Sequence, residues 1–131
     1  MTKMKMCVSA SSGSLDAAVD SRFGRCPYFV IVDSETMEFK AVANNSSSAA
    51  HGAGIQAAQT VVNLGVKVVI TGNVGPNAFN VLAATGIKII IGASGSVKEA
   101  IEKYKNGQLQ EVSNPTVGGH FGMGQGRGRG K

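Results

Sequence analysis

The sequence lacks the features of a secreted or membrane protein. None of its apolar runs is long enough to cross a bilayer, and residues 1–7 lack the continuous apolar region and cleavage site of a signal peptide. Cysteine is also scarce, because only Cys7 and Cys26 occur in the 131 residues. We therefore expect a cytoplasmic protein without membrane contacts, whose cysteines are free thiols or metal ligands rather than a disulfide.

Sequence motifs of several enzyme classes are missing as well. The chain has no phosphate-loop Lys-Ser/Thr pair, no Gly-x-Ser-x-Gly elbow and no Cys-x-x-Cys pair. Asp16, Asp20 and Asp33 do not fall in a row along the expected strands, so a two-metal nuclease site lacks its carboxylates. Because no plausible general base is present, the sequence predicts a binding protein rather than an enzyme.

Positive charge is concentrated at the end of the chain. The net charge is +5, but residues 1–117 carry ten Lys or Arg against all eight acids, a net of +2, and Arg127, Arg129 and Lys131 supply the rest. Seven of the fourteen residues from 118 onward are glycine, a composition that cannot bury enough surface to offset its ordering entropy. We therefore expect one globular domain at residues 1–117 and a flexible Gly/Arg-rich tail at 118–131.

The tail leaves a nucleic-acid-binding module as an alternative function. Residues 126–131 read GRGRGK and resemble short arginine-glycine tails that bind RNA. The domain itself is nearly neutral and lacks an aromatic stacking platform, so it gives little support for a nucleic-acid partner.

The order of apolar and polar segments predicts an α/β fold with a mixed sheet. Short, almost wholly apolar runs are typical of buried strands, and the near copies at 65–70 and 86–91 each follow a helical pattern. The close spacing of the runs at 28–32 and 39–43 suggests antiparallel neighbours. Strands are expected at residues 5–10, 28–32, 39–43, 67–71 and 88–91, and helices at 54–64, from Pro76 to Gly86, and from the capping box at 96–99 to Asn106.

Several loops should meet at one edge of this sheet. Open α/β sheets bind ligands outside the carboxyl ends of their parallel strands. If only the second strand runs backwards, the loops that reach this edge are residues 9–14, 25–27, 44–54, 71–76 and 93–96. The sequence therefore predicts a ligand site at this edge.

The loop that contains Gly72, Asn73 and Gly75 is the first candidate in this region. It precedes an expected helix, so its backbone amides could bind an anion, although it could equally be a tight turn from strand to helix. A small-anion or nucleotide sensor is therefore a further alternative function. His51, between small residues, is a candidate metal ligand or a simple helix cap.

Cys26 is the second candidate ligand. Arg22 and Arg25 precede it, and their charge would lower the pKa of the thiol and favour the thiolate that binds metals. The alternative is a buried, inert cysteine, which is also the simplest interpretation of Cys7 in the first strand.

Four sequence segments in and beside these loops resemble a known family. They read SRFGRCPYF at 21–29, HGAGIQAAQ at 51–59, GNVGPNAF at 72–79 and ATGIK at 84–88. Together they resemble the dinitrogenase iron-molybdenum cofactor biosynthesis family, the accessory proteins related to NifX, NifY and the C-terminal part of NifB, over roughly residues 4–112. The resemblance implies a ribonuclease H-like three-layer α/β/α fold with five strands, the second antiparallel.

The resemblance also implies a non-catalytic role in cofactor biosynthesis, storage or delivery. Such a protein would bind an iron-molybdenum cofactor or an iron-sulfur cluster and exchange it with a donor or acceptor protein. These clusters are anionic and expose iron, so they suit a cradle of soft ligands, cations and amides. The residues expected to form it are Cys26 and His51 as metal ligands, with Arg22, Arg25, Gly72, Asn73 and Gly75 around them.

Overall fold

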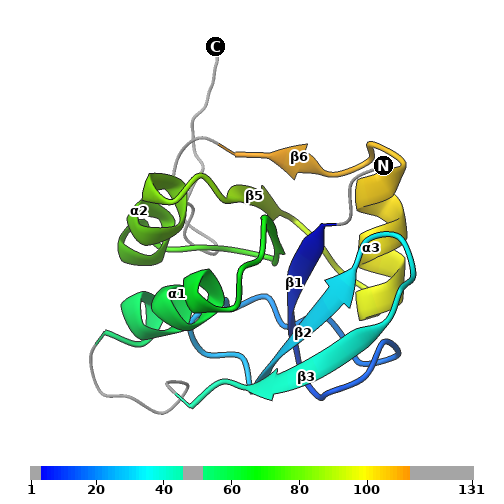
Figure 1. The fold of residues 1–131 in the computed structure, drawn as a ribbon, viewed down its shortest axis with the longest axis horizontal. Helices are drawn as coiled ribbons and strands as arrows, with labels where there is room; N and C mark the ends of the chain where they lie inside the picture. The colour runs from blue at the N-terminus through cyan, green and yellow to red at the C-terminus, as the bar shows by residue number, and fades with distance from the viewer. Residues whose placement is uncertain (1–3, 46–51, 113–131) are drawn as a thin grey trace.

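The computed structural model describes residues 4–45 and 52–112, which form a mixed sheet between helices (Figure 1). Strand order in the sheet is β3-β2-β1-β4-β5-β6. Strands β1, β4 and β5 are parallel, whereas β2 is antiparallel to both of its neighbours and β6 is antiparallel to β5. The elements are β1 (Lys5–Ala10), β2 (Tyr28–Asp33), β3 (Phe39–Ala43), α1 (Ala53–Asn63), β4 (Val68–Ile70), α2 (Pro76–Ala84), β5 (Lys88–Ile91), α3 (Val97–Lys105) and β6 (Gln110–Glu111).

The central strands are buried on both faces, which explains their continuous apolar sequences. On one face, Cys7, Phe29 and Val69 pack with α1 and α2 in one hydrophobic core. On the other face, Met6 and Val30 pack with α3 in a second core. Figure 1 shows α1 and α2 together on one side of the sheet and α3 on the other, so the fold has three layers.

Local sequence signals set the ends of the helices. Pro76 occupies the first turn of α2, where its missing N–H costs nothing. Ser96 and Glu99 form a capping box at the start of α3, with the Ser96 hydroxyl accepting the Glu99 N–H at 3.1 Å. Gly65 and Gly86 follow α1 and α2 with φ of 76° and 79°, a region that favours glycine.

The main features of the expected architecture are confirmed. All five expected strands and all three expected helices are present, with small shifts at their ends. The expectation of five strands missed β6, whose two polar residues carry no apolar pattern. None of the helices in residues 4–45 and 52–112 is long and apolar enough to span a membrane. The ribonuclease H-like classification stays a prediction, and the tail at 118–131 and the boundary at residue 117 lie outside the described residues.

A close backbone contact joins two loops at the carboxyl ends of β1 and β4. Gly72 lies so near Ser21 that a Cβ added to Gly72 would be 2.7 Å from the Ser21 Cα. The Asn73 N–H donates to the Ser21 carbonyl at 2.9 Å beside this contact. Because the contact is to backbone, a side chain at position 72 would force the loops apart.

We expect Gly72→Ala to lower the free energy of unfolding by about 1–3 kcal/mol, since overpacking of this size moves backbone rather than a flexible side chain. Gly75→Ala is the matched control, because nothing lies within 4 Å of a Cβ added there. Its cost should stay below about 1 kcal/mol, as for an N-cap glycine replaced by alanine. Urea denaturation of both variants measures the difference, and equal costs would contradict the packing argument.

Candidate functional site

A cleft of about 460 Å³ opens where α1 and α2 begin. Its walls come from three segments that are far apart in the sequence: residues 21–25, residues 52–55 at the start of α1, and residues 73–78 at the start of α2, without Val74. The second segment overlaps the end of the loop predicted at 44–54, and the third overlaps the loop predicted at 71–76. The cleft therefore lies at the edge of the sheet where the sequence predicts a ligand site.

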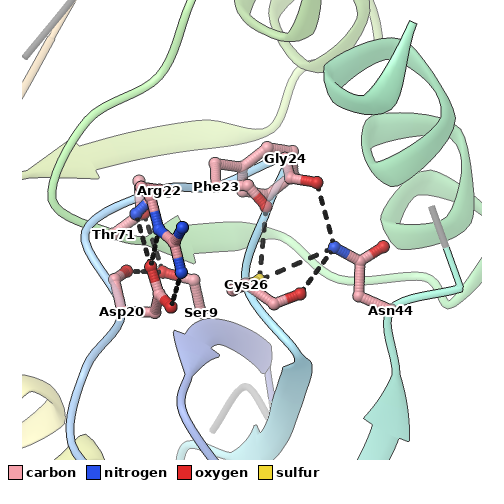
Figure 2. A network of polar contacts seen from close by, with 8 residues as sticks. All are labelled: Ser9, Asp20, Arg22, Phe23, Gly24, Cys26, Asn44 and Thr71. Carbon is pink, nitrogen blue, oxygen red and sulfur yellow. Dashed lines mark hydrogen bonds and ion pairs between the residues drawn. The ribbon is translucent and has the colours of Figure 1, made fainter. Parts of the chain in front are cut away.

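Hydrogen bonds to β1 and β4 hold the first wall in place. The Asp20 N–H donates to the Ser9 carbonyl at 2.9 Å, and the Ser9 hydroxyl donates to the Asp20 carbonyl at 2.6 Å. The Ser9 and Thr71 hydroxyls, both buried, are hydrogen-bonded at 2.7 Å. Figure 2 shows this group on one side of the loop that leads to Cys26. Residues 20–22 are thus attached to the ends of two central strands.

A glycine contact sets the distance between the first two walls. A Cβ on Gly24 would lie 2.9 Å from the Gly54 Cα, so the backbone of residues 21–25 touches the first turn of α1. Asn44, which is buried, donates from its side-chain amide to the carbonyls of Gly24 at 3.1 Å and Cys26 at 2.8 Å. These contacts fix the same loop from its other side (Figure 2).

In the part of the chain that the structure describes, the N-terminal ends of α1 and α2 have no side chain that caps their N–H groups or neutralises their partial positive charge. The N-cap residues are Gly52 for α1 and Gly75 for α2, and neither has a side-chain capping hydrogen bond. Neither helix has an acidic residue in its first turn. The first N–H groups of a helix have no partner within the helix, and the helix dipole adds partial positive charge there. The cleft is therefore suited to a negatively charged ligand.

Arg22 adds a positive side chain to the cleft and is held by Asp20. Its Nε and Nη2 donate to the two carboxylate oxygens of Asp20 at 3.0 and 2.9 Å, and its backbone N–H donates to Asp20 Oδ1 at 2.9 Å. The Asp20 side chain is 11% exposed and that of Arg22 is 63% exposed. The hydrogen bonds from Arg22 hold the pKa of the Asp20 carboxyl below its usual range. Sequence analysis missed this role of Asp20, although an Asp two residues before an Arg is a signal for such a turn.

The expectation that Cys26 carries a lowered thiol pKa is wrong. Cys26 is fully buried in the core between the sheet and α1, and its thiol donates to the Phe23 carbonyl at 3.3 Å. Burial raises the pKa of the thiol to about 12, and the negative charge of Asp20 adds to the rise. Desolvation of the buried thiol is the largest cause of the shift, and the Arg22 guanidinium is hydrogen-bonded to Asp20. Cys26 does not line the cleft, and its sulfur is not available as a ligand in this conformation.

The remaining predicted site residues divide between the cleft and its support. Arg25, Asn73 and Gly75 line the cleft, whereas Gly72 is buried behind it against Ser21. His51 lies outside the described residues. Within residues 4–45 and 52–112, no group of three or more His, Cys, Asp or Glu side chains could hold a metal ion. The described part of the site therefore offers amide and guanidinium donors rather than metal ligands.

Both cysteines should resist a thiol-specific chromogenic reagent at pH 8 in the native protein. Cys7 and Cys26 are free and buried, and burial raises the pKa of each thiol. Because the thiolate is the reactive species, labelling should wait for unfolding. Two thiols should react per chain in concentrated urea, which serves as the control. Rapid labelling of one thiol without denaturant would contradict the burial of one of the two cysteines, and peptide mapping would identify which.

The pairing of Asp20 with Arg22 should make stability depend on pH in acid. Since the pKa of Asp20 is lower in the folded protein than its ordinary value of 3.8, the pair stabilises the fold fully above about pH 5. This stabilisation is lost as the pH falls through the folded-state pKa. The difference in unfolding free energy between wild type and Asp20→Asn should therefore shrink below pH 4. A difference that stayed constant from pH 7 to pH 2 would contradict the pairing.

Known proteins share this fold and much of this sequence. The orange protein from Desulfovibrio gigas, in its apo form, is 40% identical, with a TM-score of 0.84 over 87% of this chain and 97% of that one. A proposed NifB protein from Thermotoga is 35% identical, with a TM-score of 0.77 over 88% and 99% of the two chains. An uncharacterized protein from Methanocaldococcus jannaschii is 34% identical over 92 residues, which are 68% of this chain and 78% of that protein.

The family expected from the four sequence segments is confirmed. The model of the family described as dinitrogenase iron-molybdenum cofactor matches residues 4–107, which include the three walls of the cleft. This chain therefore belongs to the dinitrogenase iron-molybdenum cofactor family.

Proposed function

We propose that this protein binds an anionic metal–sulfur cluster in the cleft and carries it, without catalysis, for cofactor biosynthesis, storage or delivery. The observation that supports this most directly is the meeting of two uncapped helix starts with Arg22 and Arg25 around one cleft of about 460 Å³. The family adds the chemical class of the guest, since its description is an iron-molybdenum cofactor.

The hydrogen-bond donors in the cleft suit such a cluster because the cluster as a whole is an anion. Backbone N–H groups and guanidinium groups form charge-assisted hydrogen bonds with anions, and hydrogen bonds to sulfur also tune metal–sulfur clusters. An iron-molybdenum cofactor and an iron-sulfur cluster both meet this description. The exchange would require a donor or acceptor protein that approaches the open side of the cleft.

A metal ligand would come from His51 rather than Cys26. His51 directly precedes Gly52, which lines the cleft, and an imidazole is a suitable ligand for iron. The Cys26 sulfur is buried behind the loop instead. We therefore assign metal coordination to His51. Anion binding is assigned to Arg22, Arg25 and the amides near Asn73 and Gly75.

Anaerobic titration with isolated iron-molybdenum cofactor, and separately with a thiolate-capped [4Fe–4S] cluster, tests this function. We expect the wild type to bind at least one of these clusters. The double variant with Arg22→Gln and Arg25→Gln should bind it about tenfold to hundredfold more weakly, because charge-assisted hydrogen bonds are lost. His51→Ala should alter the absorption or paramagnetic spectrum of the bound cluster. Cys26→Ala should leave that spectrum unchanged.

A second double variant controls for net charge. Lys98→Gln with Lys103→Gln removes the same charge from exposed positions on α3, which lies on the opposite face of the sheet. Its affinity should stay close to that of the wild type. If both double variants lost the same affinity, or if the wild type bound neither cluster, the cleft would not be the binding site.

A further inference from the structure

We infer that Asp20 is a positioning residue, which aims Arg22 into the cleft and thereby strengthens the binding of an anionic guest despite its own negative charge. This inference rests on the proposed function of the cleft. It concerns a residue that does not line the cleft itself.

The geometry of the pair leaves part of the guanidinium free for a guest. Asp20 accepts hydrogen bonds from Nε and Nη2 of Arg22, which occupy one edge of the planar group. A guanidinium has five N–H donors, so three remain for another partner. Among the described residues, Asp20 provides the only side-chain hydrogen bonds to this guanidinium, and Arg22 lines the cleft. The three N–H donors that Asp20 does not use therefore lie on a side chain that lines the cleft.

Asp20 is itself held rigidly enough to orient its partner. Both its N–H and its carbonyl are bonded to Ser9 at the end of β1, and the Ser9 hydroxyl is bonded to Thr71 just after β4. One residue further on, the Ser21 carbonyl accepts the Asn73 N–H at 2.9 Å. The carboxylate thus projects from backbone that is attached to the centre of the sheet (Figure 2).

An unclamped arginine would be a poorer ligand for an anion. The Arg22 side chain is 63% exposed, so without Asp20 it would sample many rotamers. Ordering a flexible side chain opposes binding, and a group that is already held avoids that cost. The carboxylate also acts in the opposite direction, because a negative charge near the cleft repels an anion. The two effects predict opposite signs when Asp20 is neutralised, and this makes them separable.

Asp20→Asn is the variant that separates them. Asparagine keeps the oxygen that accepts the Arg22 backbone N–H, so the turn is preserved, but it replaces the second carboxylate oxygen with an amide donor. We expect it to weaken binding of isolated iron-molybdenum cofactor, or of the thiolate-capped [4Fe–4S] cluster, by about three- to tenfold. Asp16→Asn is the matched control, because it removes an exposed charge four residues earlier with no Arg22 contact. It should leave the affinity unchanged or slightly higher.

A double-mutant cycle shows whether Asp20 acts through Arg22. In an Arg22→Gln background there is no guanidinium to aim, so Asp20→Asn should no longer weaken binding and should strengthen it slightly. A merely structural role would lower the affinity in both backgrounds. In the protein without a guest, the ¹⁵N relaxation of Arg22 Nε should show greater motion in Asp20→Asn than in the wild type.

The outcomes distinguish this inference from the function on which it rests. A wild type that bound neither cluster, or that bound them equally well after Arg22→Gln, would overturn the proposed function and this inference together. Weaker binding by Arg22→Gln combined with tighter binding by Asp20→Asn would overturn the positioning role alone. An Arg22 Nε that stayed equally rigid in Asp20→Asn would also overturn it.

Discussion

The hydrogen bonds that attach residues 20–22 to the ends of β1 and β4 are the constraint on which the candidate site depends. Ser9 bonds both polar backbone groups of Asp20, and Thr71 bonds Ser9 in a setting that is otherwise apolar. Buried polar groups of this kind stabilise only when they are satisfied, and here they satisfy one another. The carboxyl ends of two parallel strands thereby hold the wall that carries Arg22.

The same loop is bonded on its other side by Asn44, so it is fixed at both ends of its turn. The Asn44 amide reaches two carbonyls, and the Cys26 thiol bonds a third. Cys26 is therefore part of the support of the cleft rather than part of its binding surface. This division explains how one short segment, SRFGRCP, contains both a charged side chain at the cleft and a cysteine in the core.

Sequence reasoning could predict the features that depend on local pattern. The continuous apolar runs of β4 and β5 indicated a sheet covered on both faces, and Pro76 and the Ser96–Glu99 box located two helix starts. Strand direction predicted the loops of the second and third walls of the cleft, but of the first wall it predicted only Arg25 and not residues 21–24. The two-residue β6 could not be predicted, because its pairing with β5 is tertiary and its residues have no strand pattern.

The misjudged residues are those whose chemistry depends on contacts between distant segments. Arg22 precedes Cys26 by four positions and was expected to lower the pKa of the thiol, but that arginine is paired with Asp20 and the thiol faces the core. Neither the burial of Cys26 nor the anchoring of Asp20 on Ser9 is visible in a linear pattern. For Gly72 the sequence left anion binding and a tight turn open, and its close contact with Ser21 is equally invisible in a linear pattern.

The contact between Gly24 and Gly54 has a consequence for the width of the cleft. Since two walls of the cleft touch through backbone atoms at this point, no change of side chain there can bring them closer, and a larger residue can only push them apart. Under the proposed function, the size of the bound cluster would then be matched at other residues that line the cleft, such as Arg25, Ile55 and Asn77. On that proposal, one rigid frame would serve clusters of different shape, and the three side chains at its mouth would discriminate among them.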